Sequence, residues 1–207
     1  NDVLTYDIIS ADGTDATGAL TLSSGGVYAT ILNKGKIVSI YPENFGLSDV
    51  HIIEYGFQAD RPKPVQNCGH DHNDTESGQF KTIHTETNSK SGITIGSKRY
   101  NYRLAVVATG EFYKNNGNND AQVNTVIINT VNAISAIFNL EMSFKLTIGT
   151  RIFLYRDPLS DPFIPDESGG ESRTVQAGKT VALNFNASGF DIGHVFHQHE
   201  DGDGWGS

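Results

Sequence analysis

The sequence has a single cysteine, Cys68, among 207 residues. One cysteine cannot form a disulfide within the printed chain, so the fold cannot rest on a disulfide framework. Basic residues are also scarce: the chain has 15 lysines and arginines but 24 acidic residues, which gives a net charge of −9. Nucleic acids and anionic membranes attract proteins through a basic face. The charge balance therefore argues against both as partners.

Long apolar runs are missing as well. No stretch approaches the roughly 18 consecutive apolar residues of a membrane helix, so we expect no membrane span. No leader with a basic start and an apolar core is recognisable, but a chain that begins at Asn1 says little about export. The many Asn, Thr, Ser and Gly residues suit a secreted protein.

The chain divides into three parts. Residues 1–60 contain short β-branched runs separated by turn signals, and the "NKG" at 33–35 predicts a hairpin. These features predict a small antiparallel β unit. Residues 61–98 are polar and contain Pro62 and Pro64, which predicts an exposed connecting segment. A second unit spans residues 99–207.

The second unit alternates strand and helix patterns. An apolar run at 100–113 predicts a buried central strand. Residues 121–142 carry apolar residues at helical spacing after an N-cap candidate among residues 118–120. Strands are predicted at 143–155 and 189–196, with a short helix at 174–185 between them. Strand, helix and strand in this order predict a right-handed crossover between parallel strands.

Histidines and acids crowd the end of the chain, "FDIGHVFHQHEDGDGWGS". His197 and His199 would lie on one side of a strand and could share a metal ion, whereas an exposed polar loop is the simpler interpretation. The acids also resemble a Ca²⁺ loop, but the acidic positions and the closing glutamate that such a loop needs are missing.

A second group of metal-binding residue types is "NCGHDH", which holds Cys68, His70 and His72. All three are good zinc ligands, but their spacing is too tight for a usual structural zinc site. Two interpretations remain open: an exposed thiol, or a thiolate presented to a zinc ion in another part of the protein. Asp157, Asp161 and Asp166 lie among prolines and glycines and are typical of turns. Signatures of serine hydrolases, phosphate loops and dinucleotide sites are missing, and His199-Glu200 does not continue into His-Glu-x-x-His.

The order of four segments, "RLAVVATGEFY", "NTVIINTVNAISAIFNLEMSFKL", "LYRDPLSDPF" and "FDIGHVF" before a glycine-rich stretch, resembles reprolysin-like zinc metallopeptidases of the metzincin clan. The resemblance is strongest to secreted bacterial members and covers residues 100–207. The segment "GVYATILNKGKIVSIYP" is similar to the propeptides of such precursors.

The resemblance implies an α+β or α/β protein, with a twisted mixed sheet and backing helices in the second unit. It implies that residues 189–196 form an antiparallel edge strand on which an extended peptide substrate can pair. The members of this strand are Gly189, Phe190, Asp191, Ile192, Gly193, His194, Val195 and Phe196. Family members bind catalytic Zn²⁺ through His-Glu-x-x-His-x-x-Gly-x-x-His, which follows this strand and is not found in the printed sequence. No catalytic residue is therefore assigned.

The resemblance also gives Cys68 a role, because several metzincin precursors stay latent when a propeptide cysteine occupies the open zinc position. We expect part of a secreted zinc endopeptidase precursor that is latent or inactive by itself, with a peptide or protein substrate and the remaining carboxyl-terminal part of the precursor as partners. The alternatives are a non-catalytic binding or adhesion module that uses the edge strand, and a small metal-binding protein that uses the terminal histidines.

Overall fold

The computed structural model describes residues 3–12, 16–46, 49–56, 98–163 and 173–198. Its first part is a five-stranded antiparallel sheet in the order β1-β2-β3-β4-β5, in which each strand pairs with its neighbour in sequence. The strands are Leu4–Ile9, Thr17–Ser23, Gly26–Asn33, Lys36–Pro42 and His51–Gly56. The expected antiparallel β unit is therefore present.

The turn between β3 and β4 is the hairpin that "NKG" predicts. Asn33 pairs with Lys36, so Lys34 and Gly35 form a two-residue loop, and both have positive φ angles of 50° and 76°. Positive φ at both loop residues is the conformation whose twist matches that of the flanking strands. Glycine adopts it without the steric cost that Lys34 bears.

The second sheet has the strand order β7-β6-β8, and all three strands run parallel. β6 spans Tyr100–Ala108, β7 spans Phe144–Leu154 and β8 spans Ile192–Phe196. Between β6 and β7 lie the short helix α1 (Gly110–Asn115) and the long helix α2 (Asp120–Met142), and α3 (Arg173–Asn184) precedes β8.

The central strand β6 is buried on both faces, as its apolar run predicts. Leu104, Val106 and Ala108 pack with α1 and α2 on one face, whereas Ala105 and Val107 pack toward α3 on the other. The connection from β6 to β7 crosses the sheet in one direction, and the connection from β7 to β8 crosses it in the other. Because both crossovers are right-handed, α2 and α3 lie on opposite faces of the sheet. This alternation gives the second unit its layered core.

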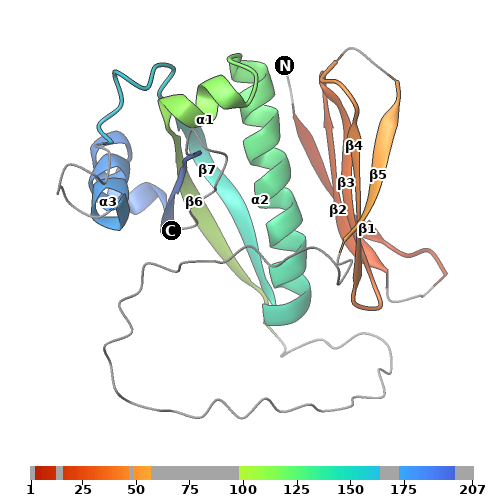
Figure 1. Ribbon diagram of the computed structural model, residues 1–207. Coiled ribbons are helices and arrows are strands. Elements are labelled where there is room, and N and C mark those ends of the chain that lie inside the picture. Colours follow the sequence, from red (N-terminus) through yellow and green to blue (C-terminus); the bar gives the residue numbers. More distant parts are fainter. Residues whose placement is uncertain (1–2, 13–15, 47–48, 57–97, 164–172, 199–207) are drawn as a thin grey trace, which may run out of the picture.

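Helix α2 begins where the sequence predicts and packs on both sheets. The Asn119 side chain accepts hydrogen bonds from the amides of Ala121 and Gln122 and so caps the helix. Val123, Ile127 and Val131 are buried against β6 and β7. Figure 1 shows α2 between the two sheets, where it contacts β7 on one side and β2 on the other.

Two expectations need correction, and the first concerns the end of the strand predicted at 100–113. Residues 110–115 are helical because Thr109 caps a new helix, so the strand ends before 113. On α2, Ile134 is 37% exposed, whereas the neighbouring Ser135 is buried and its hydroxyl accepts a hydrogen bond from the Leu146 amide of β7. Helix α2 is long and apolar enough to cross a membrane by length and composition alone, a test that core helices also pass, and it packs between two sheets; the expectation of no membrane span stays a prediction.

The second correction concerns the last strand. β8 begins at Ile192, after a short 3-10 turn at Ala187–Gly189, and it runs parallel to β6 rather than antiparallel. The crossover through α3 returns the chain to the same end of the sheet, which dictates the parallel direction. Among the described strands the second sheet is therefore parallel, not mixed.

Candidate functional site at the carboxyl edge of the parallel sheet

The start of β8 is fixed to β6 by an ion pair and a set of backbone contacts. The amide and Nε of Arg103 donate to Asp191 Oδ2 at 2.8 Å and 3.1 Å, and Nη2 donates to Oδ1 at 3.0 Å. In return the Asp191 amide donates to the Arg103 carbonyl at 2.9 Å. Hydrogen bonding to Arg103 lowers the pKa of Asp191 below its ordinary value. Asp191 is thus a register-setting residue in this structure.

The residues of β8 have different surroundings. Val195 is buried against α3, and a side chain at Gly193 would collide with Val181 of that helix. His194 contacts the ring of Phe196 edge-on at 4.8 Å. Burial lowers the pKa of His194, so its imidazole is neutral near pH 7. The other edge of β8 pairs with no strand among the described residues.

Polar side chains gather just beyond the carboxyl ends of β6 and β8. Thr109 follows β6, His197 follows β8, and Thr109 Oγ1 lies 3.2 Å from His197 Nδ1 in a hydrogen bond. The Thr109 hydroxyl also accepts from the Phe112 amide at 3.3 Å, as the N-cap of α1. Ligand sites of parallel sheets lie at this carboxyl edge. We call Thr109, Glu111, Asp161 and His197 the carboxyl-edge cluster.

Two carboxylates complete the carboxyl-edge cluster. Asp161 accepts hydrogen bonds from the amides of Gly110 at 2.8 Å and Phe163 at 3.0 Å, which ties the loop after β7 to α1. Burial raises the pKa of Asp161, and the nearby Glu111 raises it further, although the two amides oppose the shift. Glu111 Oε2 is itself buried and lies 3.9 Å from His197 Nδ1.

Aromatic stacking and amide contacts hold the chain that leaves β8. The His197 ring stacks on Phe163 at a centroid distance of 6.4 Å. The next residue, Gln198, accepts a hydrogen bond from Asn116 Nδ2 at 3.1 Å. These contacts join the end of β8 to α1 and to the loop after β7. The carboxyl-edge cluster therefore sets the path along which the chain leaves the sheet.

The metal site predicted at the terminal histidines stays a prediction, because it includes His199, which lies outside the described residues. No group of three or more His, Cys, Asp and Glu side chains that could hold a metal ion occurs in the part of the chain that the structure describes. Among the described residues, His197 contacts Thr109 and Glu111. His199 and Cys68 lie outside the described residues, so their predicted roles stay predictions.

Sequence reasoning missed Arg103, Glu111 and the structural role of Asp161. Asp161 was interpreted as a turn residue, and it does cap the turn at Phe163, but it also binds the start of α1. One signal was present in the sequence: polar Thr109 and Glu111 directly follow a buried strand. Residues at that position reach the carboxyl edge of a parallel sheet.

Comparison with known proteins identifies the second unit. The family model described as metallo-peptidase family M12B, reprolysin-like, matches residues 98–206. A search of curated proteins and a search of solved structures each found no match. The matched residues begin just before β6 and include the carboxyl-edge cluster and β8. Because the match covers more than half of the chain, the protein belongs to the reprolysin-like metallopeptidases of family M12B.

Proposed function

We propose that residues 98–207 are the amino-terminal part of the catalytic domain of a secreted zinc endopeptidase, and that residues 1–60 belong to its propeptide. The observation that carries this proposal is the family match over residues 98–206, on a strand, helix and strand unit with parallel strands. The family is one of metallopeptidases, which supports peptide-bond hydrolysis with a peptide or protein as substrate.

Zinc does not fit the described residues, because they contain no group of three metal-binding side chains. When bound elsewhere in such a domain, zinc supplies a Lewis acid and an activated water. We propose that its ligands follow the residues printed here, so no step of hydrolysis is assigned to this part of the domain. The carboxyl-edge cluster instead holds the point at which the chain turns from β8 toward those ligands.

The contact between the first sheet and α2 supports a removable propeptide. Asn132 of α2 donates to the Leu20 carbonyl and the Thr21 hydroxyl, both at 3.1 Å. Beside this link lies a partly open cavity of about 320 Å³, whose walls combine polar and apolar residues. An interface with unfilled space holds two units together less firmly than a continuous, densely packed core.

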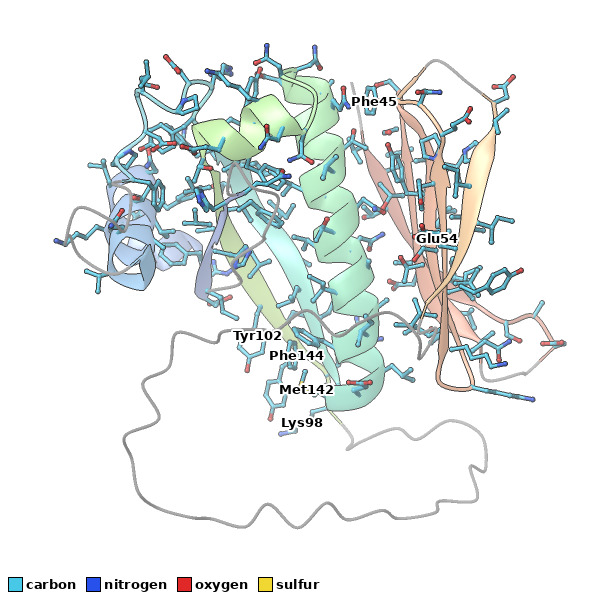
Figure 2. The ribbon with its side chains drawn as sticks, viewed as in Figure 1. Phe45, Glu54, Lys98, Tyr102, Met142 and Phe144 are labelled. Carbon is cyan, nitrogen blue, oxygen red and sulfur yellow. The ribbon has the colours of Figure 1, made fainter. Side chains whose placement is uncertain are left out.

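The lining of this cavity comes from both units. Tyr28, Thr30, Ser39, Tyr41 and Glu54 line it from the sheet, and Val126, Asn129 and Thr130 line it from α2. Glu54, labelled on the sheet in Figure 2, lines this cavity together with residues of α2. Glu54 is exposed in this structure. A helix packed firmly over it would remove the hydration of its carboxylate, which costs free energy. A face built in this way suits a unit that leaves on activation.

One observation still supports the binding of a peptide substrate along β8. Its outer edge is unpaired among the described strands, and an extended peptide could add there. The parallel direction of β8 removes the second argument, which was its match to an antiparallel rim strand. We therefore propose that residues 189–196 mainly support the fold of the domain and that substrate binding is their secondary role.

Latency through Cys68 remains part of the proposal. Cys68 lies between the two units in sequence, where a propeptide residue must lie to reach the catalytic domain. In the longer precursor, Cys68→Ala should raise peptidase activity before any cleavage, because a thiolate on zinc would displace the reactive water. His72→Ala on the same segment is the matched control. Equal latency in both variants and the parent precursor would remove the role of Cys68.

The function itself is tested with a precursor that extends beyond Ser207. We expect such a protein to bind one equivalent of zinc by metal analysis and to hydrolyse a quenched fluorescent peptide after processing, with loss of activity in a chelator and recovery with zinc. The chain of 207 residues is the matched control and should show neither property. A processed precursor without chelator-sensitive hydrolysis would contradict the proposal.

A further inference from the structure

The side of the first sheet that faces away from α2 is apolar across all five strands. Two cross-strand rows of paired residues lie on it. One row is Tyr6, Leu20, Ala29, Ile40 and Ile53, and the other is Ile8, Gly18, Ile31, Val38 and Tyr55. Neither row contains Asp, Glu, Lys or Arg. We call these ten residues the outer face.

The orientation of the sheet follows from its contacts. Asp7 binds Lys145, and Thr21 binds Asn132, so these residues point toward the second unit. Side chains alternate between the two faces along a strand, so Tyr6, Ile8 and Leu20 point away. The middle row on the α2 side reads Asp7, Ala19, Thr30, Ser39 and Glu54. The sheet thus turns its more polar side to α2 and its apolar side outward.

The described residues leave the outer face uncovered. Three side chains on the two edge strands are well exposed, Tyr55 by 71%, Ile53 by 54% and Tyr6 by 47%, whereas those on the inner strands are half-buried or buried among their neighbours. Figure 1 shows α2 on one side of this sheet and no described helix or strand on the other. Monomeric proteins rarely expose a continuous apolar patch larger than a few hundred Å². Five strands and two rows with their margins measure about 20 Å by 20 Å, so the outer face reaches that size.

We propose that the outer face packs on the outer face of a second copy of this chain, as two sheets packed face to face. A copy presents the same uncharged surface, so the contact is self-complementary and buries no unpaired charge. Each chain carries a net charge of −9, and two such chains can approach closely only where the contact itself is free of charge. A strongly basic or acidic partner would find no charge on the outer face to pair with.

The size of the outer face predicts how tight the dimer is. A planar footprint of about 400 Å², before side-chain relief adds to it, is below the roughly 800 Å² per partner of a standard stable interface. We therefore expect a reversible dimer with a dissociation constant in the micromolar range. Salt should strengthen it, because screening weakens the repulsion between two acidic chains.

Sedimentation velocity and light scattering on the chain across about 1 to 200 µM test the proposal. We expect a concentration-dependent shift from 22.5 kDa to twice that mass, with more dimer at higher salt. Ile53→Lys and Tyr55→Lys should each weaken the dimer at least tenfold. Leu159→Lys is the matched control, because Leu159 is 94% exposed and lies in the loop after β7. It adds the same charge and should leave the dimer unchanged.

Circular dichroism spectra and thermal unfolding midpoints show whether each variant folds. If Ile53→Lys does not fold, Tyr55→Lys provides the same test. A chain that stays monomeric throughout the range would overturn the proposal. So would a dimer that persists in both folded outer-face variants. A monomer whose outer face binds an apolar dye, with binding lost in Tyr55→Lys, would assign the surface to a different occupant and would equally overturn it.

Discussion

Arg103 in β6 binds Asp191, the residue before β8, through its backbone amide and through two side-chain hydrogen bonds of 3.1 Å and 3.0 Å. The pair therefore fixes both the position and the register of a strand that arrives 88 residues later in the chain. Both side chains are partly exposed. Their value lies in the geometry of the contact more than in its net energy, because exposed ion pairs contribute little.

A double-mutant cycle on Arg103→Gln and Asp191→Asn tests this pair. Each single variant should lower the urea midpoint, and the double variant should lose less than the sum of the two, because the interaction is lost only once. The pKa of Asp191 is lowered in the fold, so its stabilisation is present above the unfolded pKa and disappears as the pH falls through the folded pKa. Additive losses that do not depend on acid pH would contradict an interaction between the two.

The Thr109 hydroxyl caps α1 and contacts His197, so it joins the end of β6 to the chain after β8. Thr109→Val should lower the free energy of unfolding by about 1 to 2 kcal/mol, from the lost cap and a buried hydrogen bond. Thr147→Val is the matched control, since the Thr147 hydroxyl donates to Tyr102 at an exposed position. Urea unfolding of both variants measures the difference. Equal effects would show that Thr109 has no special role.

Asn132 of α2 donates two hydrogen bonds to the first sheet. Asn132→Ala should cost about 1 kcal/mol and should speed cleavage of the first unit under limited proteolysis, because its two hydrogen bonds hold β2 against the helix. Asn129→Ala, one turn earlier on the wall of the cavity, is the control. Proteolysis at parental rates in Asn132→Ala would mean that other contacts hold the two units together.

Asp161 gives stability a pH dependence of the opposite sign to that of Asp191. Burial raises its pKa in the fold, so the fold favours the protonated form. This contribution is fully present below the unfolded pKa of about 3.9 and is lost as the pH rises through the raised folded value. The free energy of unfolding of the parent minus that of Asp161→Asn should therefore fall as the pH rises from about 4. Urea titrations at a series of pH values give this difference, and one that rises with pH would refute the assignment.

Features set by neighbouring residues could be predicted from the sequence. The Asn119 cap, the buried stripe of Val123, Ile127 and Val131, and the turn at Gly35 all depend on residues within one or two helical turns or one hairpin. The direction of β8 could not be predicted in this way, because it depends on where α3 packs. The resemblance suggested the wrong direction for that strand.

The carboxyl-edge cluster could not be predicted from the sequence for a related reason. Glu111 and Asp161 are 50 positions apart in sequence, and His197 lies much further on. Each has an ordinary local explanation, as a helix residue, a turn residue or a loop histidine. They form a cluster only because β6, the loop after β7 and β8 end at the same edge of the sheet.

The coding sequence that follows Ser207 tests the central claim most directly. If these residues begin a reprolysin-like catalytic domain, a His-Glu-x-x-His-x-x-Gly-x-x-His motif should appear within the next few tens of codons, on a segment predicted to be helical. A stop codon there, or a different kind of domain without this motif, would contradict the account and would favour a binding module built on the same sheet.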